Sequence, residues 1–262
     1  MDTFAKNWPI ALFNRSVLKQ QKLKEILSLL GDTDSLVCLD IGSDNGVISY
    51  FLRQKGGFWK SADLEEKAVS SIRELVKTDV FQIDGRYTPF KDNEFDRVVI
   101  VDFLEHITTD REFVDELFRI MKPGAELIIN VPHIKNGLLR RFRLLIGQTD
   151  EKHGHVRPGY TVEGIKTLLG NRFTVISHKT YSKFFSEFID TLITFAYGVL
   201  KDSRGEESKK GVLVTGNDLK KYKSLFRIYS LLYPVVLFFS KLDSLLFFES
   251  GYMLILKARI NK

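Results

Sequence analysis

Four apolar runs in the first half of the sequence each end in an aspartate. These aspartates are Asp40, Asp63, Asp84 and Asp102. In a parallel sheet the carboxyl ends of the strands meet at one edge, so the four carboxylates are expected to lie near one another. A single aspartate at a strand end is usually a turn or cap residue, because its side chain accepts hydrogen bonds from nearby backbone N–H groups. Four in register favour a binding edge, with Asp63 as the candidate for gripping ribose hydroxyls.

The loop that follows the first run is rich in glycine. It reads Asp40-Ile41-Gly42-Ser43-Asp44-Asn45-Gly46 and leads into a segment with helical spacing. Glycine lets the backbone approach a ligand that a Cβ atom would block, and the start of the helix presents unpaired N–H groups. The pattern indicates a nucleotide-type cofactor site, although glycine turns also join strands to helices for structural reasons alone.

Strand and helix patterns alternate along the chain. Apolar residues keep helical spacing before the first strand and again between strands, whereas β-branched runs mark the strands themselves. We expect strands near 37–40, 58–62, 79–83, 95–102, 126–131, 172–178 and 251–260. This alternation is typical of an α/β protein with a doubly wound sheet.

Four motifs resemble those of the class I S-adenosylmethionine-dependent methyltransferases, in family order and spacing. The loop 40–46 is similar to D-x-G-x-G-x-G, and the others are YTPFKDNEFD at 87–96, DFLEHI at 102–107 and MKPGA at 121–125. The likeness covers residues 36 to about 131 and is to the small-molecule and lipid-directed branch, which includes type 11 and quinone-biosynthesis enzymes. It implies a Rossmann-like seven-stranded sheet whose last strand is antiparallel and lies between the fifth and sixth.

The resemblance also implies S-adenosylmethionine as cofactor and assigns roles at the strand ends. The glycine loop would shape the pocket for the methionine end, Asp63 would hold the ribose hydroxyls, and Asp84 would accept from the adenine amine. Asp102 would help to hold the ammonium group of the cofactor, because a carboxylate attracts a positive charge. The residues expected to bind the cofactor are Asp40, Gly42, Asp44, Gly46, Asp63, Leu64, Asp84, Gly85, Asp102 and Phe103.

Asp44 departs from the family pattern, because it stands where the family has its middle glycine. A charged side chain beside the cofactor carboxylate would weaken binding, redirect it through water, or mark a chain that no longer binds the cofactor. The alternative to an enzyme is therefore a noncatalytic membrane- or partner-binding protein on a degenerate methyltransferase fold.

Candidates for acid/base and substrate roles lie outside the glycine loop. Methyl transfer is a direct displacement, so a base is needed only where the acceptor loses a proton. His155 and His106 are the catalytic candidates, although packing at a helix start explains His106 equally well. We place His153, Arg157 and Tyr160 on the substrate side, with closure of the loop as the alternative role of Arg157. No metal is expected, because no third ligand accompanies His153 and His155.

Residues 184–248 fall outside the family core and hold nine of the 21 phenylalanines. We expect a methyltransferase domain from 1–183 and 249–262, interrupted by an amphipathic helical insertion. Glu187 is expected off the apolar stripe of its first helix, and Pro234 is expected to bend or break the second. The stripes are too interrupted to span a bilayer, which needs about 20 apolar residues. They would form core, a homodimer interface or a membrane-interfacial surface.

Net charge, the N-terminal pattern and cysteine content limit the kinds of partner and the location that we expect. The net charge of +6 and pI near 9.2 suit an anionic membrane surface or RNA, but no RNA-binding motif is found, so RNA methylation is a minor alternative. The N-terminus lacks a signal-peptide pattern and the one cysteine, Cys38, lies in a strand, which favours a cytoplasmic protein, peripheral at the inner membrane face. We expect methyl transfer to an amphiphile, either a quinone precursor, a lipid or a polyprenyl-linked saccharide, on oxygen rather than carbon or nitrogen.

Overall fold

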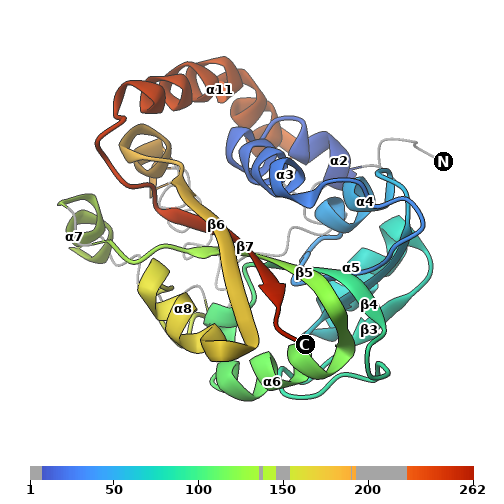
Figure 1. Ribbon diagram of the computed structural model, residues 1–262. Coiled ribbons are helices and arrows are strands. Elements are labelled where there is room, and N and C mark those ends of the chain that lie inside the picture. Colours follow the sequence, from blue (N-terminus) through green and yellow to red (C-terminus); the bar gives the residue numbers. More distant parts are fainter. Residues whose placement is uncertain (1–7, 136–137, 146–153, 190, 193–222) are drawn as a thin grey trace.

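The computed structural model describes residues 8–135, 138–145, 154–189, 191–192 and 223–262. Its centre is a seven-stranded sheet in the order β3-β2-β1-β4-β5-β7-β6 (Figure 1). Strand β7 is antiparallel to both of its neighbours, β5 and β6, whereas the other pairs are parallel. The strands are β1 (Val37–Ile41), β2 (Phe58–Asp63), β3 (Val80–Gln82), β4 (Phe95–Val101), β5 (Met121–Pro132), β6 (Phe173–Tyr181) and β7 (Met253–Ile260). The expected Rossmann-like sheet is confirmed.

Helices lie on both faces of the sheet. Helix α3 (Val17–Leu30) precedes β1, and α4 (Val47–Arg53), α5 (Glu66–Val76), α6 (Asp110–Ile120) and α8 (Val162–Leu169) each lie between two strands in sequence. The chain also forms α2 (Trp8–Phe13), α7 (Leu138–Leu145), α11 (Lys223–Leu242), and the short 3-10 helices η1 (Leu104–His106), η3 (Gly170–Arg172) and η4 (Asp243–Leu245). In Figure 1, α11 lies beside α3.

Successive residues of the central strands enter two separate cores. Cys38 packs with apolar residues of α3 and α4 on one face, and its neighbour Leu39 packs with those of α6 and α8 on the other. Side chains of a strand alternate between faces, so a central strand that is covered on both sides is apolar throughout. Burial raises the pKa of the Cys38 thiol to about 12, consistent with the expected structural role of this residue.

Strand β5 begins earlier than the sequence indicated. Met121 pairs with Phe95 and Glu126 pairs with Arg97, so the register shifts between these pairs. The extra residues accommodate the turn at Gly124, whose φ is +76°. The expected start at Glu126 marks the regular part of the strand, because a bulge interrupts the alternating pattern.

The helical segment at residues 184–189, within the region expected to be an insertion, turns polar residues inward. Ser186 and Glu187 are buried, whereas Phe184 and Phe188 are exposed. An ion pair of 3.0 Å joins Glu187 to Lys135, which follows β5. Glu187 thus lies away from the exposed Phe184 and Phe188, on a side of the helix that faces inward, where a lysine distant in sequence neutralises its carboxylate.

Helix α11 (Lys223–Leu242) continues through Pro234, so of the two expected effects, a bend or a break, the break does not occur. Contacts with the N-terminal helices hold it in place. The Tyr233 hydroxyl lies 3.5 Å from Oε1 of Gln20, and the guanidinium of Arg15 lies 6.0 Å from the tyrosine ring. On its outer side, Phe238 is 60% exposed. No helix within the described ranges is long and apolar enough to cross a membrane.

Candidate cofactor and acceptor site

The glycine loop between β1 and α4 needs two glycines in the left-handed region, where φ is +87° at Gly42 and +81° at Gly46. A Cβ atom on Gly42 would lie 2.2 Å from the backbone oxygen of Val101 in β4, and one on Gly46 would lie 2.8 Å from Cα of Ile72 in α5. The loop is therefore packed tightly against β4 and α5. Asp44 also has a positive φ, +54°, which aspartate tolerates better than most residues.

Asp40 lies beneath the loop and does not reach the surface of the site. Its carboxylate is completely buried and accepts hydrogen bonds from the hydroxyls of Ser49 (2.5 Å) and Ser61 (2.7 Å). These bonds connect β1 to α4 and to β2. Asp40 can therefore shape the pocket only through the position of the loop and strands.

Replacing Asp40 by asparagine is expected to change how stability depends on pH. Burial raises the pKa of Asp40 from 3.8 to about 6, although its two serine donors oppose the shift. Between these values the folded chain keeps a proton that the unfolded chain has released, so stability falls as pH rises through this window. Urea unfolding of both proteins across the window should show their difference in unfolding free energy changing by up to about 3 kcal/mol. Parallel stability curves would contradict this prediction.

Asp63 is held in place by two backbone donors at the end of β2. The N–H of Leu64 donates to Oδ1 (2.7 Å) and the N–H of Asp44 donates to Oδ2 (3.3 Å). An ionised carboxylate has about four acceptor positions, so ribose hydroxyls can bind the same group in addition. The bond to Asp44 joins the glycine loop to the second strand, as the expected site requires.

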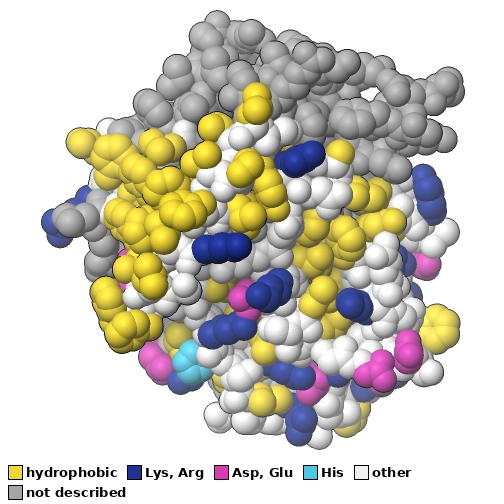
Figure 2. All heavy atoms as spheres, turned by 90° about the horizontal axis from the view of Figure 1, so that it is seen from above, with side chains coloured by type: hydrophobic (Ala, Val, Ile, Leu, Met, Phe, Trp, Pro, Cys, Tyr) yellow, Lys and Arg dark blue, Asp and Glu magenta, His cyan; other side chains and the backbone are white. Residues whose placement is uncertain are grey.

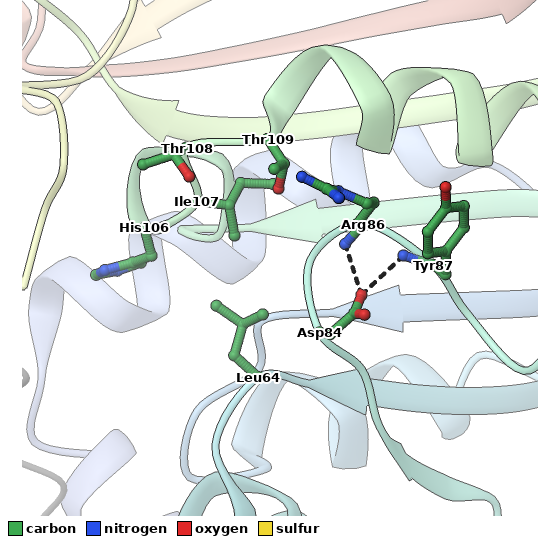
Figure 3. A pocket seen from close by; sticks show the side chains of 8 residues that line it. All are labelled: Leu64, Asp84, Arg86, Tyr87, His106, Ile107, Thr108 and Thr109. Atoms are coloured by element: carbon green, nitrogen blue, oxygen red, sulfur yellow. Dashed lines mark hydrogen bonds between the residues drawn. The ribbon is translucent and has the colours of Figure 1, made fainter.

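An open pocket of about 420 Å³ lies beyond the ends of β2 and β3 and beside η1. Figure 3 shows Leu64 and Ile107 facing each other across it, with Asp84 on one side and His106 on the other. The full lining is Leu64, Asp84, Arg86, Tyr87, His106, Ile107, Thr108 and Thr109. Two apolar walls with polar groups at either side form a slot that suits a flat heterocycle.

The loop after β3 is shaped by its aspartate and glycine. Oδ1 of Asp84 accepts from the N–H groups of Arg86 and Tyr87, both at 2.8 Å, and these bonds lower the pKa of the carboxyl group. Gly85 has φ +79°, and a Cβ atom there would lie 2.7 Å from Cγ2 of Ile107. Gly85 thus contributes by close packing against the pocket wall.

Asp102 has a partner that the sequence did not reveal. It forms an ion pair with Lys22 of α3 and accepts a hydrogen bond of 2.9 Å from Nδ2 of Asn130. The pKa of the nearby Lys19 is lowered, mainly by burial, while the charges of Asp44 and Asp102 act in the opposite direction. Two lysines of α3 therefore stand beside the two aspartates expected at the methionine end. Lys19 and Lys22 are three residues apart, which places them on the same side of one helix, and this spacing was the sequence signal for a pair of lysines at the site.

Phe103 does not line the pocket. Its side chain is 2% exposed, packs against Phe113 with ring centroids 4.9 Å apart, and lies beneath Gly42. The side chain is therefore in the core and not on the pocket surface, and the expected part of Phe103 in cofactor binding stays a prediction. Phe103 supports the glycine loop from the core, because the chain turns inward after β4.

His106 and His155 come together although 48 residues separate them. Their rings meet edge to face with centroids 4.8 Å apart, and the buried carboxyl group of Glu105 lies in the same cluster. His106 also lines the pocket. The two catalytic candidates thus share one place at its edge. His153 lies outside the described residues.

The contacts of Arg157 and Tyr160 hold their loop closed, and their expected place on the substrate side stays a prediction. The Arg157 guanidinium forms an ion pair with Asp110 and donates to the backbone oxygen of Ile107 (2.9 Å). Tyr160 is buried, with its hydroxyl 2.9 Å from Oδ2 of Asp110 and 3.1 Å from the backbone oxygen of Leu104. Both side chains are taken up by partners at the start of α6. The alternative role of Arg157, loop closure, is the one that its contacts support.

Comparisons with known proteins agree with this fold. Residues 39–129 match a family model described as a methyltransferase domain. The ubiquinone/menaquinone biosynthesis C-methyltransferase UbiE of Wigglesworthia glossinidia brevipalpis is 30% identical over 101 residues, which cover 35% of this chain and 40% of the relative. Norajmaline N-methyltransferase of Rauvolfia serpentina is 34% identical over 99 residues, covering 35% and 34%. The chain spans 34 to 56% of the length of the curated relatives that it matches.

Solved structures extend the likeness over the whole fold. The N-methyltransferase NodS of Bradyrhizobium japonicum, in complex with S-adenosyl-L-homocysteine, has a TM-score of 0.55 at 13% identity and covers 95% of this chain and 91% of its own. The [4+2]-cyclase SpnF has a TM-score of 0.60 at 17% identity, covering 92% and 80%.

The sheet order, the glycine loop and the family match define a protein of the class I S-adenosylmethionine-dependent methyltransferase fold. Within that fold, residues 39–129 are similar to the methyltransferase-domain family.

Proposed function

We propose that this protein transfers a methyl group from S-adenosylmethionine to an amphiphilic acceptor at an anionic membrane surface, on oxygen. The observation that carries the proposal is the open pocket at the carboxyl ends of the strands, with Asp84 on one side and His106 on the other. Asp63 lies at the adjoining strand end, linked to the glycine loop. These residues fit the cofactor, because they supply an apolar slot for adenine and carboxylates for its hydroxyl and ammonium groups.

The residues of the pocket and of the adjoining strand end have separate roles in the proposed reaction. Leu64 and Ile107 hold the adenine, Asp63 binds the ribose hydroxyls, and His106 lies where an acceptor can approach. The bound cofactor supplies an electrophilic methyl group. The acceptor oxygen forms a bond to the methyl carbon while the carbon–sulfur bond breaks and its electron pair goes to sulfur. His106 or His155 takes the hydroxyl proton.

Calorimetric titration tests the cofactor site directly. We expect micromolar binding of S-adenosylmethionine and of S-adenosyl-L-homocysteine. Asp63→Ala should weaken both by roughly 5- to 150-fold, equivalent to about 1 to 3 kcal/mol, because ribose hydroxyls lose a charged acceptor. Asp115→Ala is the control, since Asp115 lies on α6 and pairs with Arg172. Folded wild-type protein that binds neither compound would favour the noncatalytic alternative.

A set of exposed apolar side chains supports action at a membrane. We define the aromatic surface as Phe184, Phe188, Leu192, Leu231, Val235, Phe238, Phe247 and Phe248, all at least 37% exposed. Ring contacts connect the two halves of the insertion, from Phe184 to Phe185 (5.5 Å), on to Phe239 (6.3 Å) and then to Phe238 (5.7 Å). Figure 2 looks onto the α11 side, where hydrophobic side chains gather beside lysines and arginines.

Exposing such an apolar surface to water is unfavourable in free energy, so the surface indicates a binding partner. The first insertion helix buries Glu187 against Lys135 and turns phenylalanines outward, so its apolar side is the one offered to a partner. Basic residues of α7 and the positive net charge favour anionic lipid as that partner. A homodimer would cover the same surface. Sedimentation of the protein alone and with anionic vesicles distinguishes a dimer from a membrane-bound protein.

A further inference from the structure

Three side chains of different chemistry meet at the edge of the pocket. Glu105, His106 and His155 each offer one oxygen or nitrogen atom, and these atoms lie within 4.8 Å of one another. Glu105 and His106 come from η1, and His155 comes from the loop before α8. From the sequence, only His153 and His155 stood out as a pair of ligand type. Folding brings His155 to a different histidine and to a buried carboxyl group.

The surroundings orient one of these histidines as a ligand. Nδ1 of His106 lies 3.0 Å from the backbone oxygen of Gly154, which can only accept, so Nδ1 carries the proton. In that tautomer the lone pair is on Nε2, which is the His106 atom that would ligate a metal. Histidine ligands in metal sites commonly donate their other N–H to a backbone carbonyl in this way.

The loop that carries His155 is also fixed to η1. The backbone N–H of Val156 donates to the backbone oxygen of Glu105 at 2.9 Å. The neighbouring Arg157 is anchored to Asp110 and Ile107. These contacts hold His155 beside His106 and Glu105, and a site on anchored elements needs little rearrangement to bind an ion.

We propose that Glu105, His106 and His155 bind a divalent transition-metal ion such as Zn²⁺. Two imidazoles and one carboxylate form the ligand set of catalytic zinc sites, which keep a further position open for a substrate oxygen. The mixed nitrogen and oxygen set favours Zn²⁺, Co²⁺ or Fe²⁺ over Mg²⁺, which prefers oxygen ligands. Because His106 lines the pocket, the open position faces the place where the acceptor binds.

This inference deepens the proposed function and rests on it for the role of the ion. An ion here would bind the hydroxyl oxygen of the acceptor and lower the pKa of that hydroxyl group. With the ion bound, His106 and His155 would be ligands in place of bases, so the proton would leave to solvent. The oxygen held by the ion would then form the bond to the methyl carbon as the carbon–sulfur bond breaks with its electron pair on sulfur. The acceptor class is then an amphiphile with a hydroxyl group on its polar end, which accounts for methylation on oxygen.

Metal binding can be measured without any methyl transfer. We expect Co²⁺ to bind the full-length protein at one site with a visible absorption band, and Zn²⁺ to displace it. His155→Gln and Glu105→Gln should each weaken Co²⁺ binding at least about tenfold. His178→Gln is the control, because His178 is an exposed histidine of β6 and should bind Co²⁺ as wild type does.

The possible outcomes separate this inference from the proposed function. Absence of Co²⁺ and Zn²⁺ binding to the folded wild type, or binding that survives both substitutions, would overturn the metal site. Should Glu105→Gln fail to fold, as judged by circular dichroism, the half-buried His155 provides the decisive variant. Metal binding without S-adenosylmethionine binding would support the site and refute the proposed function, whereas the reverse result would refute the metal site alone.

Discussion

Replacing Gly42 by alanine is expected to lower the free energy of unfolding by more than about 3 kcal/mol. The left-handed φ of +87° costs a residue with a Cβ atom about 1 to 2 kcal/mol. The larger cost is steric, because the new atom would lie 2.2 Å from the backbone oxygen of Val101 and 3.0 Å from Cβ of Phe103. Neither neighbour can move without displacing β4 or the core beneath it. Such a loss is a large fraction of a typical stability of about 5 to 15 kcal/mol.

A second glycine separates strain from steric conflict. Gly124 also has a positive φ, +76°, but a Cβ atom there would meet nothing within 4 Å. Gly124→Ala should therefore cost only the backbone strain, about 1 to 2 kcal/mol. Urea unfolding followed by circular dichroism measures both variants. Equal losses at Gly42 and Gly124 would show that the loop is not packed tightly against β4.

Substituting serine for four phenylalanines of the aromatic surface should release the protein from anionic liposomes. The four are Phe188, Phe238, Phe247 and Phe248. Burying a phenylalanine side chain contributes about 1.5 to 3 kcal/mol, so losing four contacts should reduce liposome partitioning at least about 100-fold. Co-sedimentation with vesicles of phosphatidylglycerol and phosphatidylcholine measures this change. Because the residues are exposed, cooperative unfolding should survive the substitutions.

The control for this experiment is Phe58→Ser. Phe58 is 69% exposed at the start of β2, outside the aromatic surface. Its loss should leave liposome binding unchanged. If wild-type protein ignores anionic vesicles but sediments as a dimer that the quadruple variant dissolves, the surface is a subunit interface. Unchanged co-sedimentation of the quadruple variant would remove the membrane proposal.

The order of elements could be predicted from the sequence because each strand carries its signal locally. Runs such as 98–101 are apolar on both faces and rich in β-branched residues, which fits a strand covered on both sides. The glycines at 42 and 46 marked a turn that only residues without a Cβ atom can form here. These features depend on neighbours in sequence, so the fold class and the glycine loop can be recognised from the order of residues alone.

The roles of the strand-end residues depended on tertiary structure. Asp40 and Asp63 each follow a run expected to be a strand, yet Asp40 is buried beneath the loop between two serines and Asp63 is bonded to the loop itself. Strand side chains alternate in direction, and which side faces a ligand depends on the layers that cover the sheet. Periodicity along one segment carries no information about that choice.

The sequence by itself determined the methyltransferase-type sheet, the glycine turn after its first strand and the aromatic character of residues 184–248. Tertiary structure decided the pairing of Lys22 with Asp102, 80 residues apart, and the meeting of His155 with Glu105 and His106. It also decided that Glu187 is buried while Phe188 is exposed. Charges and ligands act over a few ångströms in space, and their partners here lie on other elements, so their identities emerge only when those elements pack.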